Sequence, residues 1–571
     1  MSRDTASLPF RFAVVADAHF HDPRADFGHP FGATSGLALR PLAEVSRLPR
    51  LFSETGAALE RVLDDIAARG IRDVVLLGDV TDDGQAIAFA GLRRLLDRYR
   101  RSHGLRFRGL PGNHDLYGET GRHRTRRFLG ASGHIAVTSD TAMTDPSAET
   151  LVVNLGMFCG GTASALAALP EAGLAPAGGD IFWETPFGPA PALAERRYPV
   201  RSVDGLSTLH ATDCSYLCEP APGVWFLMLD ANVFVPHDRS RRHLHREDVA
   251  DAADAGWNVA LAQKPFLIDW IASVARRAKA EGNRLIAFSH YPALDPRGGP
   301  WEEAALGPTA LSRRIPGPEV GQTLASAGLS LLFTGHLHMD AVTRSGAQGG
   351  LTDIAVPSLA AWPAGWKQVT LSADGCEIET VALDDLALPP PASAAYKAEL
   401  DRTRDGRIAP LVAAGTYGAL QRAHARLVVT RRHLRRDWPA DLAEIARHAD
   451  LADVFPPDGP AGPDRGPRVS AATFAEDWYL ARMAGALALP EIPPERVALY
   501  LALAARAGAL LRDGSPRSRF ASLLRAFAAR VSGPAGPVRL DLAGAPLAPA
   551  AVSAGAGEAG SAPRPVPSSS G

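Results

Sequence analysis

The sequence predicts an α/β fold over roughly its first two thirds, followed by a mainly α-helical C-terminal part. Short runs of β-branched and aliphatic residues recur up to residue 338, and each is followed at once by polar or charged residues. Uninterrupted apolar runs of this kind are typical of strands covered on both faces. From about residue 386 such runs become rare, and segments with helical spacing dominate.

Strands and helices alternate in the first part of the chain. The runs 11–19 and 73–80 are separated by residues 51–71, whose apolar side chains follow helical spacing and which carry Gly70 as a stop signal. A second helix is predicted over 85–104. This order predicts a parallel sheet. Further strands are predicted within four runs: 107–115, 225–232, 284–290 and 329–338. A helix is predicted over 263–282, directly before the run 284–290.

The 571 residues exceed what one ordinary core accommodates, so we expect more than one domain. A first domain is predicted over 10–385, with an Ala/Gly/Pro-rich insertion at 116–223 that holds edge strands and a covering loop. The segment "LALPPPASAAY" from Leu386 is interpreted as a linker. A helical domain is predicted over 386–542 and a disordered low-complexity tail over 543–571. The expected helical segments are 398–428, 440–455, 471–487, 494–511 and 520–531.

Composition is that of a globular protein, with 46% apolar and 21% charged residues and a net charge of -2. This balance gives no whole-chain electrostatic argument for nucleic acid or an anionic membrane. Four cysteines make no disulfide framework and are expected to be thiols in a reducing compartment. The N-terminus lacks a signal-like segment, and the apolar stretch 497–511 is too short to span a bilayer. We expect a cytoplasmic location and no membrane partner.

Metal-binding side chains follow five of the apolar runs. They are Asp17 and His19, Asp79, Asn113 and His114, His290, and the pair His336 and His338. Side chains alternate along a strand, so His336 and His338 leave the strand end on the same side. In open α/β sheets, sites form beyond the carboxyl ends of the strands, and these residues are therefore expected to converge.

The order DxH, GDxxDxG, GNHD, a lone His and GHxH resembles the calcineurin-like metallophosphoesterase superfamily, over roughly Arg11 to Asp385. The resemblance implies a four-layer α/β/β/α sandwich with two metal ions. It assigns the ligands as follows: Asp17, His19, Asp79 and His338 to the first ion, and Asp79, Asn113, His290 and His336 to the second. Such a mixture of carboxylate, imidazole and amide donors suits Mn, Fe, Zn or Ni.

The resemblance also implies a reaction. A hydroxide that bridges the two metals would attack a phosphate ester, with His114 as general acid and Asp82 as the residue that orients it. Asp115 and Asp340 are expected to support loops rather than bind metal. The basic stretch 121–128, "GRHRTRRF", is interpreted as a solvated face, with attraction of phosphate as the alternative.

Two departures from related families narrow the prediction. Asp82 stands where purple acid phosphatases carry a tyrosine, and Asp83 where protein phosphatases carry an arginine. With these two families disfavoured, the motif set resembles the bacterial phosphodiesterase-like branch of the superfamily. This resemblance favours a diester or nucleotide-type substrate. The substrate-binding residues are not identified by any motif, and oligomeric state stays open.

Two alternatives remain at this point. One is a scaffold of the same fold that binds a protein partner without catalysis. The other is a repair-type nuclease, which the arginine-rich segment 426–438 keeps open although the net charge does not support it. The C-terminal helices are expected to form a lid, a dimerisation or partner-binding module, or a domain that only adds stability.

Overall fold

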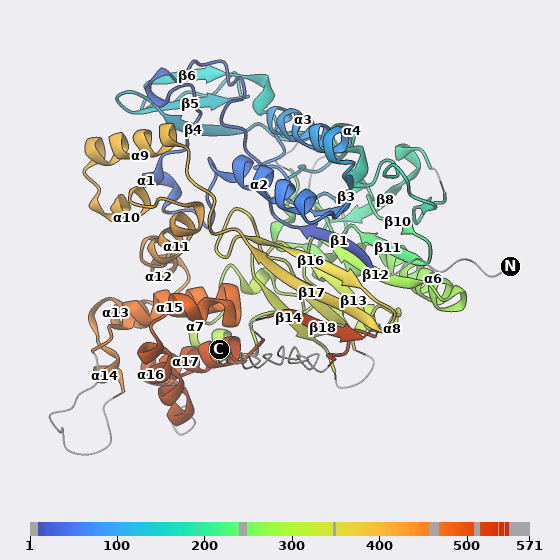
Figure 1. The fold of residues 1–571 in the computed structure, drawn as a ribbon. Helices are drawn as coiled ribbons and strands as arrows, with labels where there is room; N and C mark the ends of the chain where they lie inside the picture. The colour runs from blue at the N-terminus through green and yellow to red at the C-terminus, as the bar shows by residue number, and fades with distance from the viewer. Residues whose placement is uncertain are drawn as a thin grey trace, which may run out of the picture.

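The protein is described by a computed structural model, drawn as a ribbon in Figure 1. The structure describes residues 9–189, 191–238, 248–346, 350–455, 468–507, 514–534, 536–541 and 543–547. In this described part of the chain, no helix is both long enough and apolar enough to cross a membrane.

Two mixed β-sheets form the centre of the fold. The six-stranded sheet has the order β18 (Val538–Asp541), β17 (Gly375–Ala382), β16 (Gly365–Leu371), β1 (Phe10–Val15), β2 (Asp73–Leu77) and β3 (Arg106–Leu110). The seven-stranded sheet has the order β14 (Ala341–Arg344), β15 (Thr352–Ala355), β13 (Leu331–Thr334), β12 (Arg284–Ser289), β11 (Val224–Leu229), β10 (Tyr216–Ala221) and β7 (Trp183–Glu184). Strands β1, β2 and β3 are parallel, as are β11, β12, β13 and β15.

The two sheets pack face to face through aromatic side chains. The Phe12 ring of β1 lies 4.8 Å from the Phe226 ring of β11, in an edge-to-face arrangement. Phe288 of β12 and Phe333 of β13 stack at 5.5 Å in the same cluster. Every side chain of β2 and β11 is buried, as expected for strands covered on both faces.

Helices cover the outer face of each sheet and complete four layers. On the six-stranded sheet lie α2 (Thr55–Ala68) and α3 (Ala86–His103), whose apolar stripes join the cluster around β1 and β2. On the seven-stranded sheet lie α5 (Gly256–Gln263), α6 (Pro265–Glu281) and α8 (Pro318–Ser326). The predicted α/β/β/α sandwich is therefore confirmed.

The insertion between residues 116 and 223 contributes more than edge strands. Strands β7 and β10 lie at one edge of the seven-stranded sheet, as predicted. A separate three-stranded sheet and a two-stranded ribbon accompany them, together with α4 (Thr162–Ala168). Their strands are β4 (Thr125–Leu129), β5 (His134–Thr138), β6 (Thr150–Val153), β8 (Arg197–Arg201) and β9 (Thr208–Thr212).

The C-terminal part is helical but also adds a strand to the main sheet. Strand β18 pairs antiparallel with β17. The helices are α9 (Pro390–Thr403), α10 (Ala409–Val412), α11 (Tyr417–Val428), α12 (Leu434–Arg436), α13 (Ala440–His448), α14 (Leu451–Val454), α15 (Ala471–Ala484), α16 (Pro494–Arg506) and α17 (Pro516–Val531). Between α11 and α12 the chain continues as a π-helical turn, Val429–His433. A low-complexity tail is predicted from residue 543. Its residues from 548 on lie outside the described part of the chain.

The predicted proline-rich linker is wrong. Its prolines open helix α9, with Pro390 in the first turn, because proline lacks only an N–H that the first helical turn leaves unpaired. Helix α9 then packs its buried Tyr396 into the same cluster as α2. The division of the chain into domains at residue 385 stays a prediction.

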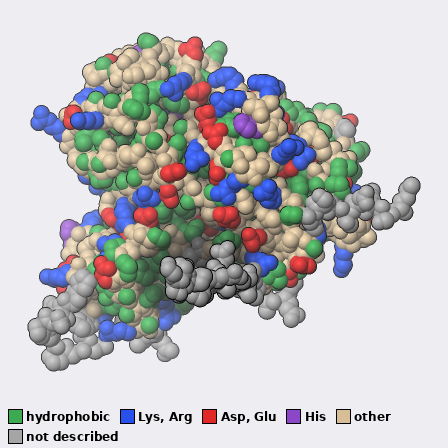
Figure 2. All heavy atoms as spheres, viewed as in Figure 1, with side chains coloured by type: hydrophobic (Ala, Val, Ile, Leu, Met, Phe, Trp, Pro, Cys, Tyr) green, Lys and Arg blue, Asp and Glu red, His purple; other side chains and the backbone are tan. Residues whose placement is uncertain are grey.

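The surface mixes charges of both signs. Figure 2 shows Lys/Arg and Asp/Glu side chains interspersed over the visible face, in agreement with the near-neutral net charge. Figure 1 shows the C-terminal helices α13 to α17 grouped below α11 and α12, beside the sheets.

Candidate metal centre

Five strands deliver the predicted metal ligands to one place. Asp17 and His19 follow β1, Asp79 follows β2, and Asn113 follows β3. His290 directly follows β12, and the pair His336 and His338 follows β13. Two compact groups result, Asp17 with His19 and His338, and Asp79 with His290 and His336, and within each group the ligand atoms lie within 4.8 Å of one another.

The spacing between donor atoms fits metal ions. The Nε2 atoms of His19 and His338 face each other at 3.1 Å, and Asp17 Oδ1 lies 3.4 Å from His338 Nε2. In the second group His290 Nε2 lies 3.2 Å from Asn113 Oδ1. Metal–ligand bonds of about 2.0–2.2 Å place neighbouring ligand atoms about 3 to 3.5 Å apart, so these donors surround positions of the right size.

Asp79 lies between the two groups. Its Oδ2 atom is 3.8 Å from His19 Nε2 and 3.5 Å from His290 Nε2. Its other oxygen, Oδ1, accepts a hydrogen bond from the backbone N–H of His114 at 2.7 Å. The carboxylate is therefore fixed in a position from which it can reach both ions.

The second ring nitrogens of two histidines are held by backbone carbonyls. His290 Nδ1 lies 3.0 Å from the carbonyl oxygen of Leu77, and His336 Nε2 lies 2.9 Å from that of Ala253. Such contacts fix the tautomer and leave the remaining nitrogen free to bind metal. The Nδ1 atom of His19 is buried without a hydrogen-bond partner among the described protein groups.

Backbone strain concentrates at this centre. Five of the predicted ligands have a left-handed backbone: Asp17, His19, Asp79, His336 and His338, with φ between 44° and 68°. Only three other described residues that are not glycine share this conformation. Strained backbone of this kind costs on the order of 1–3 kcal/mol per residue and clusters at functional sites. The turns after β1, β2 and β13 are therefore built to aim these side chains.

Burial and neighbouring charges hold Asp79, His19 and His336 in the protonation states that bind metal, but not His290. Burial raises the pKa of Asp79, but His290 and His114 outweigh burial and hold the pKa well below its usual range. Burial lowers the pKa values of His19 and His336, so both rings are neutral at pH 7. Burial also lowers the pKa of His290, but the Asp79 carboxylate raises it to about 9, and a metal must displace that proton.

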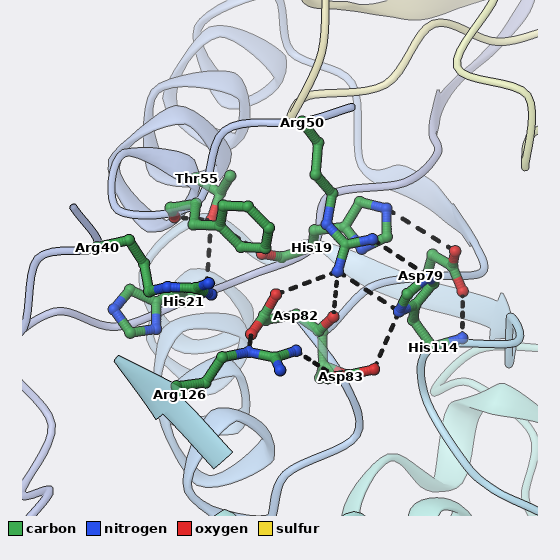
Figure 3. A network of polar contacts seen from close by, with 12 residues as sticks. His19, His21, Arg40, Arg50, Thr55, Asp79, Asp82, Asp83, His114 and Arg126 are labelled. Carbon is green, nitrogen blue, oxygen red and sulfur yellow. Dashed lines mark hydrogen bonds and ion pairs between the residues drawn. The ribbon is translucent and has the colours of Figure 1, made fainter. Parts of the chain in front are cut away.

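His114 lies beside the metal ligands and has a carboxylate behind it. Its Nδ1 atom lies 3.0 Å from Oδ1 of Asp83, not of Asp82 as the sequence predicted (Figure 3). Asp82 instead accepts hydrogen bonds from Arg50 Nη2 at 3.2 Å and Arg126 Nε at 3.1 Å. Motif spacing placed Asp82 in the orienting position, but the loop directs Asp83 toward the ring.

Arg50 is a site residue that no motif revealed. Figure 3 shows its guanidinium between Asp82 and His114. Its Nη1 atom lies 3.1 Å from His114 Nε2, the nitrogen that faces away from Asp83. The side chain is largely buried and lies over the Phe52 ring at 5.0 Å. It follows the short helix α1 (Leu42–Val45), far in sequence from every ligand motif.

In the basic stretch 121–128, His123 and Arg127 are exposed, but the other arginines turn toward the site, so the interpretation as a solvated face is wrong for them. Arg124 and Arg126 both form ion pairs with Asp83, and Arg126 also pairs with Asp82. These arginines outweigh burial and hold the pKa of Asp83 well below its usual range. Arg124 and Arg126 lie two residues apart and share one side of the chain. Their partners lie about 40 residues away, which hides the pairing from local sequence reasoning.

Asp115 and Asp340 support loops, as predicted. Asp115 accepts hydrogen bonds from the backbone N–H groups of Val80, Thr81 and Gly112. Burial, with help from Asp79, raises its pKa to about 6. Asp340 accepts hydrogen bonds from Lys367 Nζ at 3.0 Å. Neither carboxylate belongs to the two metal-binding groups of the described residues.

The centre opens into a cavity of about 560 Å³, a size typical of small-molecule sites. One wall carries Asp79, Asn113, His114, His336 and His338. Another wall comes from the C-terminal helices, so these helices enclose the site. The residues of this second wall include His424, Val428, Arg432, His433, Tyr479 and Met483.

The C-terminal helices form direct hydrogen bonds with the loop that carries His336 and His338. The N–H of Asp340 donates to the carbonyl of Met483 at 2.7 Å, and Arg530 Nη2 donates to the carbonyl of Asp340 at 2.9 Å. Arg482 forms a bidentate ion pair with Glu302, in which Nε and Nη2 each lie 2.8 Å from a carboxylate oxygen. The second wall of the cavity is therefore rigidly placed relative to the metal ligands.

Comparison with known proteins gives one family match and several distant structural similarities. The family model described as calcineurin-like phosphoesterase matches residues 10–184. This span contains the motifs with Asp17, Asp79 and His114. No curated protein matches the chain.

Three solved structures illustrate the structural similarities. A dimetal phosphatase from Danio rerio shares 15% identity, with 66% of this chain and 96% of that chain covered and a TM-score of 0.35. GAP50, the anchor in the inner membrane complex of Plasmodium, shares 10% identity, with coverages of 65% and 84% and a TM-score of 0.27. The phosphopantetheinyl hydrolase of Mycobacterium tuberculosis shares 12%, with coverages of 61% and 90% and a TM-score of 0.22.

Similarities at these TM-scores support no argument about activity. The family match has a different basis, since it covers three of the five motifs in the order expected of the family. Residues 10–184 of the chain therefore match the calcineurin-like phosphoesterase family model.

Proposed function

We propose that this protein is a dinuclear metal-dependent phosphoesterase that acts on a diester or nucleotide-type substrate. The observation that carries the proposal is the convergence of two groups of metal-binding side chains on the shared carboxylate of Asp79, beside His114. In the proposal Asp17, His19, Asp79 and His338 hold one ion, and Asp79, Asn113, His290 and His336 hold the other. Mn, Fe, Zn and Ni all suit these donors.

When bound, two divalent ions supply an activated water and neutralise charge on the phosphate. Side chains of the protein transfer the proton and contact the substrate. In the proposal His114 gives a proton from Nε2 to the leaving oxygen while Asp83 holds Nδ1–H; this requires the leaving oxygen to replace the Arg50 N–H that faces Nε2 in the structure. Arg50, 3.1 Å from that Nε2 atom, is placed to contact an anionic group that reaches His114.

The cavity supports a substrate with a sizeable leaving group. A pocket for inorganic phosphate alone has no need of about 560 Å³, and the apolar side chains of Leu306, Leu337 and Met483 line part of it. Pockets of this size enclose most of the surface of a small organic ligand. We include a cytoplasmic location in the proposal, supported by four free and buried cysteines.

The test is hydrolysis of bis(p-nitrophenyl) phosphate and p-nitrophenyl phosphate by protein that has been stripped of metal and reloaded with Mn. We expect metal-dependent turnover with about two metal ions per chain, and a fall of about 10²-fold or more in His114→Ala. The matched control is His123→Ala, since His123 contacts Ser139 and does not line the cavity. The diester-to-monoester ratio then reports the substrate class.

Two results would count against this function. Metal-loaded protein that hydrolyses neither ester would favour the non-catalytic scaffold. Turnover that His114→Ala and His123→Ala reduce equally would remove His114 from the mechanism while leaving the metal centre in place.

A further inference from the structure

The second wall of the cavity presents charged side chains from an unusual helical turn. Residues Val429–His433 form a π-helical turn between α11 and α12, and Arg432 and His433 of this turn line the cavity. π-helical turns are rare and occur frequently at functional sites, because the extra residue per turn redirects the side chains. The position of this turn at the cavity therefore needs a functional explanation.

The turn is held in place by contacts of His433. His433 Nδ1 lies 2.7 Å from Oδ2 of Asp437, and its ring stacks on Tyr479 at 4.4 Å with an interplanar angle of 10°. Trp438 Nε1 in turn donates to Tyr479 Oη at 3.2 Å. These contacts hold the backbone of the turn from which the Arg432 side chain reaches the cavity wall.

Arg432 carries a positive charge and forms no ion pair within 4 Å among the described residues, although the Asp437 carboxylate lies near enough to influence it. Its hydrogen bond goes to the carbonyl oxygen of Arg47 at 3.3 Å. Burial and the nearby charge of Arg436 lower the pKa of its guanidinium, the Asp437 carboxylate opposes this in part, and Arg314 lowers the pKa further. A half-buried charge without a partner is costly. A negatively charged ligand group would relieve that cost.

Other cations that line the cavity favour the same kind of ligand. Arg40, Arg50, Arg124 and Arg314 line it together with Arg432. The carboxylates of Glu44, Asp83, Glu302 and Asp437 also line it, and each of them contacts an arginine or histidine side chain. A cavity whose carboxylates have such partners, and in which Arg432 forms no ion pair with a described residue, suits a ligand with anionic acceptor oxygens.

We propose that Arg432 binds a second anionic group, a phosphate or a carboxylate, on the leaving part of the ester that the metal centre cleaves. The proposal rests on the proposed function for the first phosphate and adds the chemistry of the rest of the substrate. The apolar side chains of Leu337, Trp362 and Met483 line the same cavity and suit an uncharged connecting part. The substrate is then a phosphate ester with two anionic groups, both enclosed in one cavity.

The test uses matched substrate pairs that differ in one anionic group. Adenosine 3′,5′-bisphosphate with adenosine 5′-monophosphate tests a phosphate, and 3-phosphoglycerate with glycerol 3-phosphate tests a carboxylate. For each pair the ratio of kcat/KM values is measured with Mn-loaded wild type, Arg432→Met, Arg432→Lys and Arg436→Met. Dissociation constants of all four compounds are measured by calorimetry on a His114→Ala background.

We expect the wild type to favour the doubly charged member of at least one pair. Arg432→Met reduces that advantage by about 10-fold or more, the loss expected for one charge-assisted hydrogen bond. Arg432→Lys restores part of it, which separates loss of charge from misfolding. Arg436→Met leaves the advantage intact, since Arg436 is a neighbouring exposed cation that does not line the cavity.

Different results would overturn the two proposals separately. If the wild type shows no preference within either pair, or if Arg432→Met retains the whole preference, the second anion site is wrong although hydrolysis continues. If metal-loaded wild type hydrolyses neither these monoesters nor bis(p-nitrophenyl) phosphate, the phosphoesterase function fails. The dissociation constants then still decide whether Arg432 binds a second anion.

Discussion

Asp82 and Asp83 are consecutive carboxylates in one loop, yet they have different neighbours. Asp83 contacts the His114 ring and the guanidinium groups of Arg124 and Arg126. Asp82 contacts Arg50 and Arg126 and does not reach the ring. Both are buried and both lie among arginines, so they form a matched pair for separating orientation of His114 from general electrostatics.

We expect Asp83→Asn to lower kcat for phenyl phosphate about 10- to 100-fold, the usual cost of losing such a supporting partner. The loss should be smaller for p-nitrophenyl phosphate, whose leaving oxygen needs less help from an acid. Asp82→Asn should affect both esters to the same extent, since it leaves the His114 contact intact. The measurement is kcat for both esters with both variants. The idea fails if Asp82→Asn, and not Asp83→Asn, discriminates between the leaving groups.

The metal ligands could be predicted from the sequence because each follows a buried strand within a recognisable motif. The orientation of His114 could not, since a loop decides which of two adjacent carboxylates faces the ring. Arg50 was missed, and Arg126 was assigned to a solvated face, for another reason. Their partners are brought close only by the fold, and neither arginine belongs to a metal-ligand motif.

At the scale of elements, the C-terminal helices hold the segment that carries Arg40 and Arg50. Glu399 of α9 accepts hydrogen bonds from the backbone N–H groups of Leu42 and Ala43, at the start of α1. His424 of α11 lies with Nε2 3.1 Å from the carbonyl of Val45, at the end of the same helix. Both ends of α1 are therefore fixed by side chains from residues beyond 386.

The His424 contact predicts a pH dependence of stability. Burial lowers the pKa of His424 to about 4, so the ring is neutral in the folded protein well below its ordinary pKa of 6.5. The unfolded chain takes up this proton at a higher pH than the folded chain does. The free energy of unfolding therefore falls as the pH drops from about 6.5 toward 4, by about 3 kcal/mol for this group.

The measurement is urea unfolding of wild type and His424→Gln at several pH values between 4 and 7. The glutamine amide can still donate to the Val45 carbonyl but does not titrate. We expect the variant to lose about 3 kcal/mol less than the wild type over this range. His448→Gln serves as the control, because His448 is exposed and should leave the pH dependence as it is. Equal pH dependence in wild type and His424→Gln would contradict the assignment.

The elements themselves were predictable to different degrees. All six predicted strands of the first part occur, because each combines an apolar run with polar residues at its end. The long helix expected over 398–428 is instead divided into α9, α10 and α11. Pro410 in α10 and Gly415 before α11 lie at the interruptions. The π-helical turn leaves no local sequence signal, since tertiary contacts to Asp437 and Tyr479 fix it.

At the scale of the whole molecule, the helical part shares cores with the sheets. One cluster joins Trp366 of β16 and Leu59 of α2 with Tyr396 and Tyr417 of the C-terminal helices. A second cluster joins Leu306 of α7 (Trp301–Leu306) and Trp362 with the helices α13 to α17. These contacts, together with strand β18, connect the C-terminal part to the metal-binding part at several separate places.

We therefore expect the metal-loaded chain to unfold in one calorimetric transition, although its length alone favours several domains. Chelation should lower the Tm of the whole transition, because metal that binds only the folded state stabilises it. At a free metal concentration 100 times the dissociation constant, this adds about 2.7 kcal/mol to the free energy of unfolding. Phe474 belongs to the second cluster, and Phe474→Ala should lower the free energy of unfolding in the same transition by about 3–5 kcal/mol. Two transitions, of which only one responds to chelation and only the other to Phe474→Ala, would show that the helices fold independently of the centre they enclose.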